Sequence, residues 1–213
     1  MSYCDFAALE RTPLERDPFD FVVVPDFLRS EIFASVLADY PEVPGPGSHP
    51  PAELEIHGHF RSLIDELRGS EFQAAIERKF EIDLSGRPTM YTVRGYVCER
   101  DGAIHTDSKS KIVTVLLYMN ERWQEDAGRL RLLRGPDNLD DYVAEVPPYG
   151  GTLLAFRRAD NSWHGHKRFT GRRRAIQLNW VTSQAVVDAE QNRHRLSTKL
   201  KRFKNLFVRS SAA

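Results

Sequence analysis

Three side chains that can bind a metal ion stand out in this chain of 213 residues. His105 and Asp107 lie two positions apart in Ile-His-Thr-Asp, and His164 occurs much later in Ser-Trp-His-Gly-His. Two histidines and one carboxylate form the facial triad that holds non-haem Fe(II) and leaves coordination positions open. Side chains two positions apart on a strand point to the same face, so His105 and Asp107 can contact one ion. We expect His164 to supply the third ligand from another part of the fold.

Two adjacent arginines, Arg173 and Arg174, follow His164 and open a strand-like run. A guanidinium group binds a carboxylate through two parallel hydrogen bonds, so either arginine can hold an acidic ligand near the metal. Neighbouring side chains on a strand face opposite sides, so only one of the two can point inward. We favour Arg173. If Arg173 points inward, the alternate side chains that follow it line a polar pocket, whereas an inward Arg174 would give a less polar pocket. The inward side chains would be Ala175, Gln177 and Asn179 in the first case, and Ile176, Leu178 and Trp180 in the second.

The composition predicts one domain and excludes several classes of protein. A hydrophobic content of 41% is enough for a sizeable core. The 30 basic and 30 acidic residues cancel, so the chain has no general attraction to nucleic acid or to an anionic membrane. Two cysteines, Cys4 and Cys98, argue against a disulfide framework and favour a reducing compartment. We find no signal-peptide pattern and no run of about 18 apolar residues, so we expect a cytoplasmic protein without a membrane partner.

Helical and β-strand patterns occupy different parts of the sequence. The N-terminal part predicts a strand at 19–28 and a proline-rich loop at 41–51. It also predicts three helices, at 30–40, 60–68 and 70–80. Short β-branched and aromatic runs then alternate with turns, and they predict strands at 89–98, 111–119, 128–134, 143–146, 151–157 and 173–182. We therefore expect a single domain over 1–213. An N-terminal strand and supporting helices would occupy 1–87, the β core 88–183, and a basic C-terminal helix and tail 184–213.

The C-terminal segment 184–207 has many basic residues and an apolar stripe at helical spacing. The stripe consists of Leu196, Leu200, Phe203 and Phe207. We expect it to pack on the β core or on a second subunit. The lysines and arginines opposite it should be solvated, since a charged helix face is more often exposed to water than bound to nucleic acid.

Six segments, in order along the chain, resemble the catalytic core of the 2-oxoglutarate- and Fe(II)-dependent dioxygenases, in the prolyl 4-hydroxylase-like branch. The segments are His105-Thr106-Asp107, the strand from Val113 to Asn120, Gly128 to Leu132, Gly151 to Phe156, Ser162-Trp163-His164 and Gly171-Arg172-Arg173. The resemblance implies a mostly β fold with flanking helices. Its core would be a double-stranded β-helix, which is a cupin-like jelly roll, with helical support at the N-terminus.

The same resemblance implies roles for particular residues. Fe(II) would be bound by His105, Asp107 and His164. The distal carboxylate of the cosubstrate 2-oxoglutarate would be bound by Arg173, with Arg174 as the alternative. The hydroxyl groups of Tyr118 and Tyr96 would assist, although each of these residues could equally be an ordinary core tyrosine. His166 could be an ordinary surface residue, or it could face the substrate or support the site, and L-ascorbate is a candidate reductant.

The reaction implied is a hydroxylation that consumes O2 and converts 2-oxoglutarate to succinate and CO2. The substrate stays open: the branch includes enzymes that act on a protein or peptide proline and others that act on small molecules or sugars. A second class of function is a non-catalytic jelly-roll binding module. A third is a hydroxylase of nucleic acid, which the neutral net charge disfavours.

Overall fold

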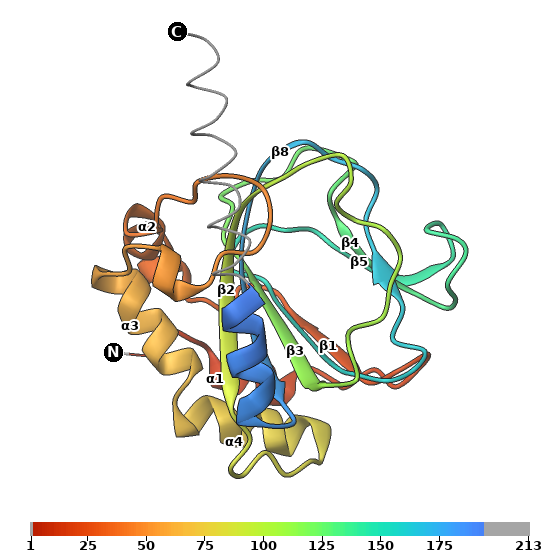
Figure 1. Cartoon of the computed structure of the whole chain (residues 1–213), viewed down its shortest axis with the longest axis horizontal. Helices are drawn as coiled ribbons and strands as arrows, with labels where there is room; N and C mark the ends of the chain where they lie inside the picture. The colour runs from red at the N-terminus through yellow and green to blue at the C-terminus, as the bar shows by residue number, and fades with distance from the viewer. Residues whose placement is uncertain (1, 194–213) are drawn as a thin grey trace, which may run out of the picture.

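Two antiparallel β-sheets face each other in the computed structural model, which describes residues 2–193 (Figure 1). The larger sheet has five strands in the order β1-β6-β3-β8-β2, and the smaller has three in the order β5-β4-β7. Sequential strands alternate between the two sheets from β5 to β8, and the arrangement confirms the predicted jelly roll. The strands are β1 Phe21–Val24, β2 Thr89–Val97, β3 Lys111–Tyr118, β4 Leu130–Leu133, β5 Tyr142–Val146, β6 Leu153–Arg157, β7 His164–Gly165 and β8 Gly171–Val181.

A layer of helices covers the face of the five-stranded sheet that lies away from the smaller sheet (Figure 1). Helices α3 and α4 have apolar side chains at helical spacing, and these are buried against the sheet. The helices are α1 Phe6–Arg11, α2 Ser30–Ala38, α3 Gly58–Leu67 and α4 Ser70–Phe80, with a single 3-10 turn at Pro51–Glu53.

The five-stranded sheet separates two hydrophobic cores because successive side chains on a strand point to opposite faces. On β8, Leu178 and Trp180 pack into the core under the helices. On the opposite face, Tyr118 of β3 and Ala175 of β8 pack into a smaller core between the sheets, together with Leu132 of β4. With both faces covered, the central strands are rich in apolar residues throughout.

Most of the predicted elements are present, and the differences lie in short or irregular segments. Helix α1 and the two-residue strand β7 were not predicted. The N-terminal strand is shorter than the predicted range 19–28. The segment around His105 and Asp107 is an extended loop with a single β-bridge, from His105 to His164, rather than a regular strand.

The C-terminal segment is helical from residue 184 to residue 193, where the described part of the chain ends. Val187 in this helix is buried. The predicted stripe of Leu196, Leu200, Phe203 and Phe207 lies outside the described residues. None of the helices within residues 2–193 has the length and apolar character needed to span a bilayer.

Candidate metal and cosubstrate site

The three predicted metal ligands meet at one point between the sheets. Each of His105, Asp107 and His164 offers one ligand atom, and these atoms all lie within 4.8 Å of one another. A β-bridge joins the two histidines: the amide of each donates to the carbonyl oxygen of the other at 3.0 Å. Their rings lie 4.3 Å apart between centroids. The pairing of β7 with this loop therefore brings two distant parts of the sequence to a single site.

Backbone carbonyl groups orient both imidazole rings. The Nδ1 atom of His105 lies 2.9 Å from the carbonyl oxygen of Ala103, and that of His164 lies 3.0 Å from the carbonyl oxygen of Ser162. A ring whose Nδ1–H donates to a carbonyl group has its Nε2 lone pair available for a metal. Burial, and to a smaller extent the nearby His105, lower the pKa of His164 to about 4. His164 is therefore neutral at pH 7, which is the form that binds metal ions.

Asp107 is a buried carboxylate with two side-chain partners. The ammonium group of Lys111 lies 2.7 Å from Oδ1, and the hydroxyl group of Thr114 donates to Oδ2. Asn179 in turn donates to the Thr114 hydroxyl oxygen at 2.8 Å. Burial raises the pKa of Asp107, but the Lys111 charge, with the nearby His164 and these hydrogen bonds, outweighs burial and brings the pKa below its usual value. Asp107 is thus ionised and fixed in orientation, as a metal ligand must be.

Two buried hydrogen-bonding groups deeper in the site have no partner among the described residues. Arg173 is only 4% exposed, and its Nε–H donates to the carbonyl oxygen of Gly128 at 2.7 Å, but its Nη2 atom is unpaired. The hydroxyl group of the fully buried Tyr118 is unpaired too, and the guanidinium carbon lies 5.3 Å from the centroid of the Tyr118 ring. Buried polar groups normally have partners. A carboxylate would satisfy both, so these residues fit the distal end of 2-oxoglutarate.

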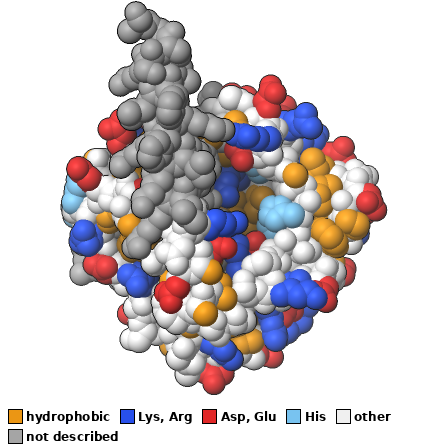
Figure 2. All heavy atoms as spheres, viewed as in Figure 1, with side chains coloured by type: hydrophobic (Ala, Val, Ile, Leu, Met, Phe, Trp, Pro, Cys, Tyr) orange, Lys and Arg blue, Asp and Glu red, His pale blue; other side chains and the backbone are white. Residues whose placement is uncertain are grey.

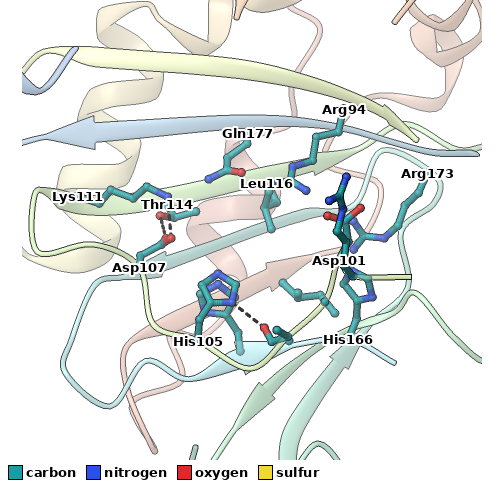
Figure 3. A pocket seen from close by; sticks show the side chains of 16 residues that line it. Arg94, Asp101, His105, Asp107, Lys111, Thr114, Leu116, His166, Arg173 and Gln177 are labelled. Carbon is teal, nitrogen blue, oxygen red and sulfur yellow. Dashed lines mark hydrogen bonds and ion pairs between the residues drawn. The ribbon is translucent and has the colours of Figure 1, made fainter. Parts of the chain in front are cut away.

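The triad and Arg173 line one cavity of about 310 Å³ (Figure 3). Leu116 and Leu130 contribute apolar walls, as expected from the sequence. Figure 2 shows the corresponding hollow on the surface, with a histidine at its edge and basic side chains beside it. His166 also lines the cavity, and burial, followed by the charge of Arg173, lowers its pKa to about 4, so this ring is neutral at pH 7 as well.

Two residues considered for the cosubstrate lie outside this cavity. Arg174 points to the other face of β8, where its guanidinium carbon lies 5.0 Å from the centroid of the Tyr40 ring. Tyr96 is 37% exposed and lines the same outer hollow as Arg174. Tyr96 and Arg174 therefore lie on the outer side of the sheet, and of the two arginines Arg173 is the one inside the cavity of the triad.

A β-bulge explains the position of Tyr96. Regular alternation would turn Tyr96 to the same face as Arg94, which lines the cavity. The pairing of β2 with β8 shifts register between these two residues, and Tyr96 then pairs with the outward Arg172. Gly95 lies at the shift, where a Cβ atom would approach the Val43 side chain to 2.7 Å. The close approach of Val43 requires glycine here.

Sequence reasoning missed several residues that line the cavity, among them Lys111, Thr114, Arg94 and Gly102. The alternation of β3 places Thr114 on the same face as Leu116, so Thr114 could have been found from the strand pattern. Gly102 has a φ of +92°, and a Cβ atom there would lie 2.5 Å from Nδ1 of His166. Nothing in the sequence indicated that this glycine lies against His166.

Residues 89–182 match the sequence model of the 2OG-Fe(II) oxygenase superfamily, and this range includes the triad, Tyr118 and Arg173. No curated protein sequence matches the chain significantly.

Solved prolyl 4-hydroxylases have a similar fold. The structure of a prolyl-4-hydroxylase from Pseudomonas putida aligns with a TM-score of 0.56 and 16% identity, over 84% of this chain and 94% of that one. The 2OG complex of a viral collagen prolyl hydroxylase from Paramecium Bursaria Chlorella virus-1 aligns with a TM-score of 0.50 and 15% identity, over 76% of this chain and 96% of that one. A prolyl 4-hydroxylase from Phytophthora capsici aligns with a TM-score of 0.50 and 17% identity, over 90% of this chain and 72% of that one.

The family match and the His-Asp-His cluster confirm the expectation of an Fe(II)- and 2-oxoglutarate-dependent dioxygenase, which takes 2-oxoglutarate and O2 as cosubstrates. The role of L-ascorbate stays a prediction. Residues 89–182 therefore resemble the 2OG-Fe(II) oxygenase superfamily in sequence, and the β core has the fold of the prolyl 4-hydroxylases.

Proposed function

We propose that this enzyme hydroxylates an organic substrate at a C–H bond, with His105, Asp107 and His164 as the Fe(II) ligands and with Arg173 and Tyr118 as the 2-oxoglutarate anchor. Bound Fe(II) supplies the oxidative chemistry that couples the conversion of 2-oxoglutarate to succinate and CO2 with hydroxylation. The observation that carries this proposal is the buried, unpaired Nη2 atom of Arg173, which lies in the same cavity as the triad and beside the ring of Tyr118, whose hydroxyl group is also unpaired.

The side chains of the protein bind and orient in this scheme, and none of them is needed as a nucleophile. His105, the neutral His164 and the ionised Asp107 would hold Fe(II) as three ligands of fixed orientation. An arginine can form two parallel hydrogen bonds to a carboxylate. The Nε–H of Arg173 donates to Gly128, and its Nη2 atom is still available to a ligand. Leu116 and Leu130 restrict water near the reacting groups.

The substrate class is the open part of this proposal. The structural neighbours act on prolyl residues according to their names, and a peptide proline is accordingly one candidate. Small molecules and sugars are the others. A non-catalytic binding module is disfavoured because it gives no reason for a buried, unpaired Nη2 atom of Arg173 in a cavity lined by three metal ligands.

A succinate-formation assay tests the proposal. The purified protein is incubated with Fe(II), 2-oxoglutarate and O2, first without any substrate and then with candidate substrates. We expect Fe(II)-dependent succinate formation, which the His105→Ala variant should lose. His57→Ala is the matched control, because His57 is exposed and lies outside the cavity. An absence of Fe(II)-dependent succinate in every reaction would count against catalysis.

A further inference from the structure

Two cationic side chains that line the cavity, Arg94 and the exposed Arg100, are used neither by the metal ligands nor by the proposed cosubstrate anchor, and Arg94 is the less exposed of the two. Arg94 lies on β2, and its side chain points into the cavity from the sheet face that also bears Gln177 (Figure 3). Within the described part of the chain, its guanidinium group has no hydrogen bond and no ion pair. Arginines that are not fully exposed normally have partners, so an unpaired one in a cavity indicates a missing ligand.

The backbone around Arg94 is built to hold its side chain in this direction. The hydroxyl group of Tyr40 lies 2.7 Å from the carbonyl oxygen of Arg94 and 3.2 Å from that of Ala175, the residue paired with Arg94 on β8. The β-bulge follows immediately, with Gly95 packed against Val43. Arg94 is therefore the last residue of β2 to point inward before the strand changes face.

Arg94 also lies where two cavities meet. The first contains the triad and Arg173. The second, of about 580 Å³, shares Arg94, His105, Asp107 and Gln177 with the first but not Arg173, and it adds hydroxyl groups from several serines and threonines. A cosubstrate bound between Arg173 and the metal would occupy the first cavity. The second cavity would then remain open beside the metal ligands His105 and Asp107, and Arg94 would lie at the boundary between the two cavities.

The charges in the first cavity do not balance. It is lined by Arg94, Arg100, Lys111 and Arg173, against two carboxylates, Asp101 and Asp107. Asp107 is paired with Lys111, and Asp101 accepts a hydrogen bond from the amide of Cys98 at 2.7 Å.

The environment of Arg94 itself adds to this imbalance. Burial and then the nearby charge of Arg173 lower the pKa of Arg94, and the smaller opposing effects of Asp101, Tyr118 and Asp107 do not outweigh them. An anion beside Arg94 would relieve both effects, because it would neutralise a positive charge that is partly removed from water.

We propose that the substrate of this enzyme is a small organic anion and that Arg94 binds its carboxylate or phosphate group. This inference rests on the proposed function, since it places the substrate at the metal site. The polar lining supports it: among the side chains that line the first cavity, the apolar ones are Ala103, Leu116 and Leu130. Arg94 is in this view a specificity-determining residue that excludes neutral analogues.

Binding measurements on the full chain test this inference without turnover. The protein is loaded with Mn(II) and 2-oxoglutarate and titrated calorimetrically with two matched pairs of probes. N-acetyl-L-proline and its neutral amide test a carboxylate, and glucose 6-phosphate and glucose test a phosphate. We expect the anionic member of at least one pair to bind about tenfold more tightly or better, which corresponds to about 1.4 kcal/mol, because only the anion can form a charge-assisted hydrogen bond with Arg94.

Substitution of Arg94 separates its role from that of a structural residue. Arg94→Met keeps the length of the apolar stem but should abolish the preference for the anion, and Arg94→Lys should keep part of it. The affinity for 2-oxoglutarate should change little in both variants. The melting temperature of Arg94→Met should not fall, because the substitution removes an unpaired charge. Arg172→Met is the control, since Arg172 is exposed on the outer face of β8.

Three results would overturn the inference. The first is that no anionic probe binds better than its neutral partner, and the second is that the preference survives in Arg94→Met. The third is a loss of 2-oxoglutarate affinity in Arg94→Met as large as that in Arg173→Met, which would make Arg94 part of the cosubstrate site. Failure of the proposed function is a different result, namely no Fe(II)-dependent succinate from the wild-type protein, and it is measured separately.

Discussion

The two faces of the five-stranded sheet are made by the same strands but have opposite chemical character. The outer face of β8 presents Ile176, Leu178 and Trp180 to the helices. Its inner face presents Arg173 and Gln177 to the cavity. The outer face therefore gives stability, and the inner face bears the groups proposed to bind ligands. Alternation along a strand lets one segment do both, so substitutions one residue apart should have effects of different kinds.

The largest expected effect is on the inner side, at the metal. His105→Ala removes one of three ligands, and we expect Fe(II)-dependent succinate formation to be lost. The fold should persist, because the His105 side chain is exposed and its bridge to His164 uses only backbone groups. Turnover assays and circular dichroism melting would measure the two properties. Full activity of this variant would show that the triad is wrongly assigned.

The next largest effect is expected on 2-oxoglutarate affinity, and it should differ between two adjacent arginines on opposite faces of β8. Arg173→Ala should weaken 2-oxoglutarate binding by about 2–5 kcal/mol, because a buried carboxylate loses its charged partner. Arg174→Ala should change it little, since this side chain lies over Tyr40 on the outer face. Calorimetric titration of both variants with 2-oxoglutarate, in the presence of Mn(II), gives the affinities. The reverse ranking would mean that the cosubstrate does not bind where the unpaired donors lie.

On the outer face the effect should appear in stability alone. Leu178 is 1% exposed, and Leu178→Ala should lower the free energy of unfolding by about 2–5 kcal/mol through lost burial and the cavity it leaves. Urea denaturation measures this change, and Leu178→Met is the control that nearly keeps side-chain volume. The affinity of the folded variant for 2-oxoglutarate should equal that of the wild type. A selective loss of affinity would show that the two faces are not independent.

The smallest effect concerns the support of a metal ligand. Thr114→Val keeps the side-chain shape but removes the hydroxyl donor to Asp107, and outer partners of this kind typically change metal affinity by about 10–100-fold. Lys111 still pairs with Asp107 in this variant, so some affinity should remain. Titration with Mn(II) measures the change. Thr89→Val, at the far end of β2, should leave the affinity as it is.

The sequence predicted the parts of the site that depend on local spacing or on strand alternation. The two-residue spacing of His105 and Asp107 and the alternation of β8 after Arg173 are patterns of this kind. The outward position of Tyr96 was not predictable, because it depends on a β-bulge at Gly95 and on the contact of Gly95 with the distant Val43.

Tertiary contacts determine the remaining features. Helix α1 has six residues and β7 has two, so neither has enough length for a periodic pattern. Arg94 was missed because a single charged residue on a strand predicts nothing about its partners. Its significance is evident only when the surrounding side chains are known.

The reciprocal backbone hydrogen bonds between His105 and His164 affect the thermodynamics of metal capture. Two ligands far apart in the chain are already held at a fixed separation, so folding, rather than the ion, bears the entropy cost of closing the intervening loop. Preorganisation of this kind favours tight binding and rapid loading of the apoprotein. It also implies that insertions in surface loops between the two histidines would be tolerated by the metal centre, provided that β7 still pairs with β4 and with the His105 loop.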